Sequence, residues 1–480
     1  MSHCGYVTTL KNVRPHPNAD RLVLATCFDS TVCVKKDMYA EGEIGIYFET
    51  DLQLSMEFCK QNGLLAVYEH GKNISGGYMD PAKRNVKAIK LRGEQSDGLF
   101  LPLACVAYTG VNLDDLNIGD QITVLNGHEI CRKFIPVNKN KPATVAGGAG
   151  KRTKRRAKRT IAPVFYEHKD TEQLQYHLAD FKPGDQIEIT RKLHGTSGRT
   201  AYTKVFKGMK RTFWDWLFRR EGTPIYDWGY VTGTRRTVLD TYDGGFYGSN
   251  LFRKQYHDFF EGKLWKGETV YYEILGFTHE GQPIMNQCPN KRLNDEEFIK
   301  KYGDFTTFSY GCDPKGYTGC DGWGVNSDPK DPDGNILTVK PQSRIFVYRM
   351  TMTNEDGEVV EYTPDFIRHR CMYMGVDFVP VEWIGVIPDE EVFTGTSCEF
   401  TDAGEFVLEK AKEFYDGPEP LDTSHIREGV VVRVINRPNF TAYKHKNFQF
   451  KVLEGIIKET AETPDLEEAE ELEVEYEAEN

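Results

Sequence analysis

The 480-residue sequence lacks several features that would assign it to a broad class of protein. It has no apolar run long enough to span a membrane, and its first residues, MSHCGYVTTLKNV, contain no signal-peptide core. Its 11 cysteines are odd in number and scattered, which favours a reduced, cytoplasmic setting over a disulfide framework. Cys312 and Cys320 have no second ligand pair at metal-binding spacing, so we interpret them as loop residues. These absences predict an intracellular globular protein with no membrane partner and no evident obligate protein partner.

The excess of acidic over basic residues lies almost entirely in one segment. The net charge is −12, but residues 454–480 hold 12 acidic residues and one lysine, which leaves −1 for the preceding 453 residues. This tail has few large apolar residues and is predicted to be disordered. In contrast, KRTKRRAKRT at 151–160 has seven cations in ten residues, a run that is usually a solvated arm but also attracts phosphates.

Four segments are predicted along the chain. Residues 1–130 carry short β patterns between turns, which is typical of a small barrel, and residues 131–163 are rich in Gly, Ala, Pro and cations, as in a flexible linker. Residues 164–453 form a mixed α/β segment, followed by the acidic tail at 454–480. The strands predicted within residues 164–453 are DQIEIT, YVTGT, TVYYEIL, RIFVYRM, REGVVVRV and TAYKHKNFQFKV. A turn-rich insertion spans residues 278–342, and a second insertion, TFWDWLFRREG, carries aromatic residues that we interpret as ordinary packing (Trp214, Trp216 and Phe218).

The stretch IEITRKLHGTSGRT combines a strand with a glycine-containing turn. Ile187 to Thr190 alternate apolar and polar residues, which predicts a half-buried strand. Lys192, His194 and Gly195 follow, and glycine lets a backbone turn sharply or approach a ligand closely. Taken alone, Lys192 fits a solvated loop cation as well as a nucleophile presented at the end of a rigid strand.

The later strands contain charged residues that change this balance. Glu273 lies inside an otherwise apolar strand and Glu428 begins another, and a carboxylate there is costly unless it meets a cation, a metal or a ligand. Lys444 and Lys446 are two residues apart on a predicted strand, so both point to one face and favour an anion between them. A lysine nucleophile, two carboxylates and a lysine pair, in this order, predict a site for a triphosphate and a metal.

This series resembles the covalent nucleotidyltransferases, which comprise ATP-dependent RNA and DNA ligases and mRNA capping enzymes. KLHGTS is similar to the K-x-H-G nucleophile motif of nick-sealing RNA ligases in the RNA ligase 2 and RNA ligase 5 branch. The resemblance implies an α+β fold, with an N-terminal OB-fold β-barrel before an α/β nucleotidyltransferase domain. That domain would be ATP-grasp-like, with two antiparallel sheets flanked by helices.

The resemblance also implies a role for each motif residue. Lys192 would take AMP from ATP, with Gly195 in the nucleotide-binding turn, and Glu428 would bind Mg²⁺ or Mn²⁺. The remaining nucleotide-binding positions would be Arg235, with Arg236 as its rival, Glu273 at the ribose, Tyr348 or Phe346 at the adenine, and Lys444 with Lys446 at the phosphates. Two departures stand out: the gap from Glu273 to Tyr348 is wider than in the family, and Arg191 stands where an acid is expected.

The N-terminal segment carries a second resemblance. VRPHPNADRL and IKLRGEQSDGLFLP resemble the signature stretches of the OB-fold tRNA-binding module attached to several tRNA synthetases. This implies RNA contacts through His16, Asn18 and Arg92, joined by Arg236 of the catalytic segment. The alternative is a barrel that serves only domain packing.

Together the two resemblances imply an intracellular RNA ligase, a class that includes phage-encoded enzymes. It would join 3′-hydroxyl and 5′-phosphate ends through lysyl-AMP and RNA-adenylate, in nicked duplexes or tRNA-like ends, as in RNA repair. A capping guanylyltransferase or a DNA ligase would use the same lysine but places its OB module after the catalytic domain. A non-enzymatic tRNA-binding protein would leave the series from Lys192 to Lys446 without a purpose.

Overall fold

Two units make up the chain in the computed structural model, which describes residues 3–69, 72–134, 161–218, 222–243, 247–278, 282–285, 296–302, 310, 343–394 and 400–460. The first, which we call the barrel unit, comprises Met1–Lys141 and Phe448–Pro464. The second, the sheet unit, comprises Pro142–Asn447 and Asp465–Asn480. Within the described residues, no helix has the length and apolar character needed to cross a membrane. The basic run at 151–160 and the pair Cys312 and Cys320 lie outside the described residues.

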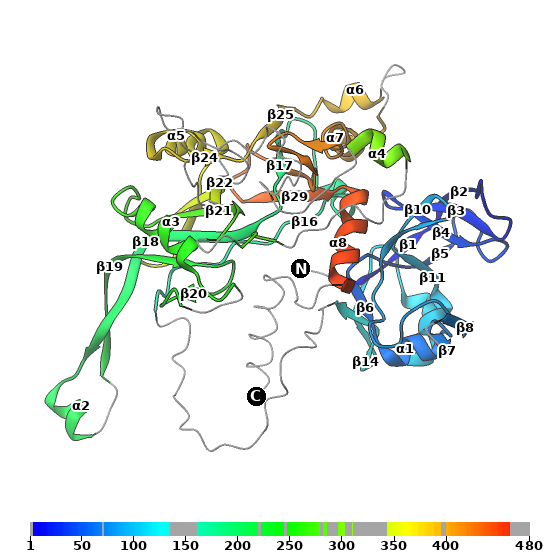
Figure 1. Cartoon of the computed structure of the whole chain (residues 1–480), viewed down its shortest axis with the longest axis horizontal. Coiled ribbons are helices and arrows are strands. Elements are labelled where there is room, and N and C mark those ends of the chain that lie inside the picture. The colour runs from blue at the N-terminus through cyan, green and yellow to red at the C-terminus, as the bar shows by residue number, and fades with distance from the viewer. Residues whose placement is uncertain are drawn as a thin grey trace, which may run out of the picture. The chain divides into compact units, whose positions relative to one another are not determined.

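Short strands build the barrel unit (Figure 1). They are β1 Gly5–Thr9, β2 Lys11–Pro15, β3 Leu22–Cys27, β4 Ser30–Lys35, β5 Ile44–Phe48, β6 Leu52–Leu54, β7 Ala66–Glu69, β8 Lys72–Gly76, β9 Ala88–Leu91, β10 Glu94–Asp97, β11 Leu99–Pro102, β12 Gln121–Ile122, β13 Val124–Leu125, β14 His128–Glu129 and β15 Cys131–Lys133. The main sheet has the order β11-β5-β1-β12, and β2-β3-β4 form a separate three-stranded sheet. Helix α1 is Met56–Gln61, and 3-10 turns span Leu103–Thr109 and Leu113–Asp115.

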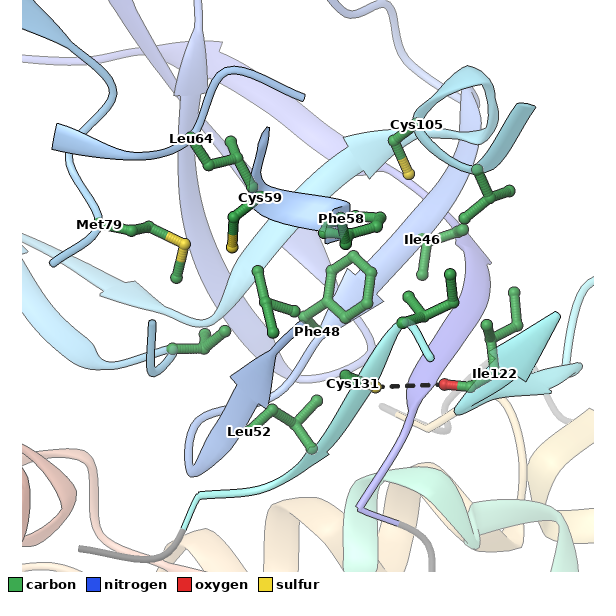
Figure 2. Close-up of a cluster of buried hydrophobic side chains, with 14 of the residues drawn as sticks. Ile46, Phe48, Leu52, Phe58, Cys59, Leu64, Met79, Cys105, Ile122 and Cys131 are labelled. Atoms are coloured by element: carbon green, nitrogen blue, oxygen red, sulfur yellow. Dashed lines mark hydrogen bonds between the residues drawn. The ribbon is translucent and has the colours of Figure 1, made fainter. Parts of the chain in front are cut away.

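The core of the barrel unit lies between its sheet and α1. Figure 2 shows Phe48 of β5 and Phe58 of α1 at its centre, where the two rings meet edge to face with centroids 5.3 Å apart. Ser55 caps α1 by accepting a hydrogen bond from the Phe58 backbone amide, which fixes the start of the helix that carries this ring. The Cys131 thiol contacts the Ile122 carbonyl at 3.3 Å, and this buried cysteine serves as an apolar side chain rather than a bridge.

Helix α8 (Phe448–Thr460) completes the barrel unit from the far end of the chain. Phe450 and Leu453 are buried, and the Lys451 amine pairs with the Asp97 carboxylate of β10 at 2.6 Å. Here the structure differs from the sequence prediction, in which the strand TAYKHKNFQFKV continued to Val452 and a disordered tail began at 454. The alternation in NFQFKV fits a strand, but Phe450 and Leu453 are also three residues apart on one helical face.

A five-stranded sheet forms the first layer of the sheet unit. Its order is β16 (Glu172–Gln173), β29 (Thr441–Lys446), β28 (Gly429–Val434), β17 (Gln186–Lys192) and β25 (Val381–Val386). One face packs on helix α7 (Ala403–Lys412) through a buried aliphatic cluster that includes Ile187, Ile189, Val430, Val432, Val407 and Leu408. The opposite face carries Glu188, Thr190 and Lys192. The strand prediction for Ile187–Thr190 is confirmed, but both faces are buried, because Glu188 is paired with Arg368 on the second face.

A seven-stranded sheet forms the second layer. It runs β20 (Val238–Leu239), β19 (Thr223–Gly233), β18 (Thr196–Lys210), β21 (Glu268–Gly276), β22 (Ser343–Thr353) and β23 (Val359–Glu361), with β24 (Asp377–Phe378) paired to β22. All neighbours in the two sheets are antiparallel except β16 with β29 and β22 with β24. The 15-residue strand β18 and the six-residue strand β25 lie outside the strand patterns read from the sequence, as do the short strands β16, β20, β23 and β24.

Helices α3 (Leu251–Phe260) and α5 (Pro364–Met374) cover one face of this second sheet (Figure 1). Arg370 of α5 and Glu268 of β21 form a fully buried pair there, with nitrogen-oxygen distances of 2.7 and 2.8 Å. The other face turns toward the five-stranded sheet: Arg349 of β22 and Arg433 of β28 lie over the same Phe440 ring, 4.8 and 5.0 Å from its centroid. The remaining elements are α2 (Phe213–Leu217), α4 (Glu296–Tyr302), α6 (Glu390–Thr394), β26 (Pro418–Glu419), β27 (Asp422–Ile426) and 3-10 turns at Leu174–Tyr176 and Leu178–Asp180.

Candidate active site

Lys192 ends β17 at a point where three strands of the five-stranded sheet line up. It lies opposite Gly429 of β28, and Gly429 in turn lies opposite Lys446 of β29. Directly opposite residues in adjacent strands project from the same face, so the two lysines flank a residue with no side chain. Gly429 has φ +145°, and a Cβ there would lie 2.1 Å from the His445 carbonyl oxygen. Only glycine allows β28 and β29 to meet here.

Glu428 joins the two lysines. Its Oε1 lies 2.7 Å from Lys192 Nζ and 3.3 Å from Lys446 Nζ, and the residue is 2% exposed. Burial alone would raise the pKa of Glu428, but Lys192, Lys446 and His194 outweigh it and hold the pKa well below its usual value. The carboxylate is therefore an anion held between cations, on the polar face of the sheet.

The turn after Lys192 rests against the second sheet. A Cβ on Gly195 would lie 2.3 Å from the Ile274 carbonyl oxygen of β21, so the glycine permits a close backbone approach. Leu193 is buried in an apolar cluster with Leu275 of β21 and Phe346 of β22. The turn thereby fixes the end of β17 against β21, and His194 Nδ1 comes within 3.7 Å of Glu428 Oε2.

Glu273 lies on β21 in the row next to this turn. It is opposite Ser197 of β18 on one side and Phe346 of β22 on the other. The Ser197 hydroxyl donates a hydrogen bond to Glu273 Oε2 at 3.4 Å. Glu273 is partly exposed, and its neighbour Phe346 belongs to the cluster that holds Leu193. Glu273 thus projects from the same face of the sheet as Phe346, and the turn after Lys192 packs against this face.

The two candidate aromatic residues differ in accessibility. The register of β21 and β22 shifts between Tyr271 and Tyr272, so that Tyr348 is an extra residue between the paired positions Val347 and Arg349. Phe346 is buried in the Leu193 cluster, whereas Tyr348 is partly exposed at its margin and meets His168 edge to face with centroids 4.9 Å apart. Phe346 and Tyr348 are two residues apart on β22 and belong to the same cluster, so both rings face the same side of the sheet.

The other residues predicted for the site are Lys444 and the arginines of one turn. Lys444 shares a strand face with Lys446 and lies opposite Val431, one row further along β28. Arg235 and Arg236 lie in the turn between β19 and β20, where both pair with Asp170. This turn is held by the buried Arg199, which donates a hydrogen bond to the Thr234 carbonyl at 2.9 Å. The contacts thus join Lys192, Glu428 and Lys446 directly, and the arginine turn is anchored separately at Asp170.

Arg191 has a structural position that the sequence reading did not anticipate. It lies on the opposite face from Lys192, where it is buried and pairs with Glu382 at 2.5 Å and Glu419 at 2.9 Å. Strand alternation alone places residues 191 and 192 on opposite faces, and this signal was present in the sequence. Tyr310, a second residue that sequence reasoning missed, is buried in the cluster with Leu193.

In the barrel unit, the two signature stretches meet. His16 is buried, and its ring nitrogens lie 3.0 Å from the Leu91 carbonyl and 3.1 Å from the Asn18 amide. The Asn18 side chain donates to the Arg92 carbonyl at 3.0 Å. His16 and Asn18 therefore hold the two signature stretches together, whereas Arg92 is exposed to solvent.

A divalent metal fits the chemistry of Glu428. The described residues contain no group of three or more His, Cys, Asp or Glu side chains that could hold a metal. Among the same residues, Glu428 Oε2 is buried and has no hydrogen-bond partner. One such carboxylate suits Mg²⁺ or Mn²⁺, because these ions commonly take one or two protein carboxylates and complete their shell with phosphate oxygens and water.

Nearly the whole chain aligns with the solved structures of an RNA ligase from Naegleria gruberi. A mutant of that ligase with AMP and Mn gives a TM-score of 0.51 at 15% sequence identity, over 94% of this chain and 98% of that chain. An apo mutant gives 0.52 at 15% identity over 95% and 99%, and the ligase with PPi gives 0.51 at 15% over 96% and 100%.

The sequence comparisons concern the barrel unit. A family model described as an OB-fold domain matches residues 5–103, and no curated protein matches the chain. The predicted α+β fold and N-terminal OB-fold domain are confirmed. The chain thus combines an OB-fold domain with a sheet-rich second unit and shares the overall fold of the Naegleria gruberi RNA ligase.

Proposed function

We propose that this chain is an ATP-dependent RNA ligase that joins 3′-hydroxyl and 5′-phosphate ends in nicked duplexes. The observation that carries the proposal is the placement of Lys192 at the end of a rigid strand, with Glu428 and Lys446 in direct contact. The fold neighbours support it, because the Naegleria gruberi structures contain ATP and Mn, AMP and Mn, or PPi.

In the first step, the Lys192 amine attacks the α-phosphorus of ATP. A nitrogen-phosphorus bond forms, the bond to the β-phosphate oxygen breaks, and pyrophosphate leaves. Lys192 Nζ is held by Glu428 and must leave that ion pair and give up a proton before its lone pair can attack. Lys446, and Lys444 on the same strand face, would neutralise charge on the phosphate oxygens as pyrophosphate departs.

The surrounding residues would bind the nucleotide. Glu273 offers a carboxylate oxygen to the ribose hydroxyls, and Gly195 leaves the turn backbone close to β21. Tyr348 is the better candidate for stacking on adenine, because Phe346 is buried in the apolar cluster. Glu428 would hold a divalent cation, which supplies charge neutralisation at the α-phosphate.

The second and third steps use the RNA ends. A 5′-phosphate oxygen attacks the lysyl-AMP phosphorus and frees Lys192, and a 3′-hydroxyl then attacks the activated 5′-phosphate and releases AMP. Arg235 or Arg236 would contact the 5′-phosphate after leaving Asp170. The barrel unit, through Arg92 among others, would hold the strand that bears the 3′-hydroxyl.

The deciding experiment incubates the protein with α-labelled ATP and Mg²⁺ or Mn²⁺, followed by denaturing electrophoresis. Wild type should become covalently labelled, Lys192→Ala should not, and Lys254→Ala, which removes an exposed lysine on α3, should match wild type. Labelling by α-labelled GTP instead would identify a capping-type enzyme. Sealing of nicked DNA in preference to nicked RNA would identify a DNA ligase. Undiminished labelling of Lys192→Ala would refute the proposed nucleophile.

A further inference from the structure

The ribbon formed by β18 and β19 carries a cluster of exposed aromatic residues at its end. Figure 1 shows the two strands running out from the sheet to the short helix α2. The large apolar side chains there are 50 to 69% exposed: Phe213, Trp214, Trp216, Leu217 and Phe218. The interpretation of these aromatics as ordinary packing is therefore wrong. The sequence pattern showed a short amphipathic stretch but not whether a second surface covered it.

The tip is a built structure rather than a frayed loop. The strands pair from Arg199 with Gly233 out to Lys210 with Thr223. A capping box then starts α2, in which Thr212 accepts from the Asp215 amide and Asp215 accepts from the Thr212 amide. Trp214 and Phe218 stack with centroids 6.0 Å apart, and Phe213 contacts both tryptophans. Rings held in this way lose little further conformational freedom on binding.

Positive charge accompanies the aromatics. Among the described residues between Tyr202 and Tyr230, four cations (Lys204, Lys207, Lys210 and Arg211) stand against two acids (Asp215 and Asp227), a net charge of +2. Lys207, Lys210 and Arg211 are exposed on the approach to α2, and Asp215 is occupied by the capping box. Asp227 is turned back to the amide of Trp228. The ribbon is therefore a local cationic surface.

An aromatic cluster on a cationic stem matches the chemistry of RNA. Each base offers a flat face for stacking, and each phosphate offers a negative charge to a lysine or arginine. A membrane surface also attracts aromatic and basic residues, but it is normally bound by a long amphipathic helix, and α2 has five residues. An apolar protein groove would account for the rings and leave the lysines without counter-charges. The observations favour RNA.

We propose that the β18–β19 ribbon and α2 form an RNA-binding arm, in which Trp214 and Trp216 stack on unpaired or terminal bases while Lys207 and Lys210 contact phosphates. The arm rests on the proposed ligase function for its substrate, and it adds a contact separate from Lys192 and from the OB-fold domain. Its task would be to hold an RNA end or a frayed strand beside the sheet unit.

The test measures RNA binding and the reaction with ATP separately, on the full chain. Fluorescence anisotropy without ATP would give the Kd for fluorescein-labelled single-stranded RNA with a 5′-phosphate and for a nicked RNA duplex. Trp214→Ala/Trp216→Ala should weaken binding about tenfold or more. Lys207→Ala/Lys210→Ala should weaken it and reduce the slope of log Kd against log salt by about one to two. The matched control is Met372→Ala/Tyr373→Ala on α5, whose side chains are 74 and 78% exposed, and it should bind RNA like wild type.

Several outcomes would overturn the arm. RNA affinity of the tryptophan variant equal to wild type would do so, as would an equal loss in the α5 control. Sedimentation with phosphatidylserine-containing vesicles that depends on the two tryptophans, without any change in RNA binding, would assign the tip to a membrane surface instead. If wild type fails to form lysyl-AMP, the ligase proposal fails, whereas the anisotropy measurements still decide the arm. Circular dichroism of each variant checks that its fold is retained.

Discussion

Lys192 and Lys446 lie on either side of Gly429 and share one oxygen of Glu428, at 2.7 and 3.3 Å. Two like charges are stable so close together only because the buried carboxylate lies between them. Under the proposed function, the same arrangement would supply both the nucleophile and an electrostatic partner for phosphate. Removal of any one of these three charged side chains should therefore alter the charge balance around the other two.

Lys446→Ala should lower the rate of lysyl-AMP formation about 10²- to 10³-fold, because it removes a cation next to Lys192 that, under the proposed function, would neutralise charge on the reacting phosphate. Lys444→Ala should also lose adenylylation, through weaker triphosphate binding. Single-turnover labelling over a range of ATP concentrations separates the two effects. Wild-type labelling by both variants would exclude the lysine pair from phosphate binding, and Lys254→Ala serves as the control.

Gly429→Ala should strongly reduce lysyl-AMP labelling while it lowers the free energy of unfolding only modestly. An added Cβ would collide with the His445 carbonyl and push apart the ends of β28 and β29 that carry Glu428 and Lys446. We expect a stability loss of about 1–3 kcal/mol. Gly375→Ala is the matched control, because Gly375 also has positive φ but nothing within 4 Å of its added Cβ. Equal activity loss in both variants would show that close approach at Gly429 has no special role.

The buried pair of Arg370 and Glu268 should matter for folding rather than catalysis. Arg370→Ala or Glu268→Ala leaves a buried charge unpaired and should lower the free energy of unfolding by about 3–5 kcal/mol in urea titrations. The exposed pair of Lys254 and Asp258 provides the comparison, and its loss should cost about 0.2–1 kcal/mol. Similar costs for the two pairs would contradict the role given to burial.

Removal of the barrel unit should separate the two halves of the reaction. A chain of residues 161–447 should still react with ATP but seal nicked RNA poorly, because the two ends lose their common binding surface. In the full protein, sealing should weaken steeply with salt while lysyl-AMP formation changes less. A chain of residues 161–480 should aggregate more readily than 161–447, because Phe450 and Leu453 of α8 would be exposed. Equal sealing by the short and full chains would exclude the barrel unit from substrate binding.

Much of the sheet unit could be predicted from the sequence because its chemistry follows strand alternation. The strand ending at Lys192, the acid in β21 and the lysine pair in β29 each stood out against apolar neighbours. The exposure of Trp214 could not be predicted, because a short amphipathic pattern does not state whether a partner surface exists. The helix at Phe448 was missed because a short apolar alternation fits strand and helix equally. The chemical roles of all the site residues, Lys192 and Glu428 included, stay predictions.

The return of α8 to the barrel unit has a consequence for how the protein is made. The ribosome delivers the strands of the OB-fold domain first and delivers Phe450, Lys451 and Leu453 only after Pro142–Asn447 of the sheet unit. During that interval Asp97 lacks the lysine that pairs with it at 2.6 Å in the finished protein. Domains usually fold in order from the N-terminus, but here the first domain to appear is the last to be completed. A nascent chain that stalls before residue 448 would therefore release a barrel with an uncovered apolar surface, which chaperones and proteases recognise.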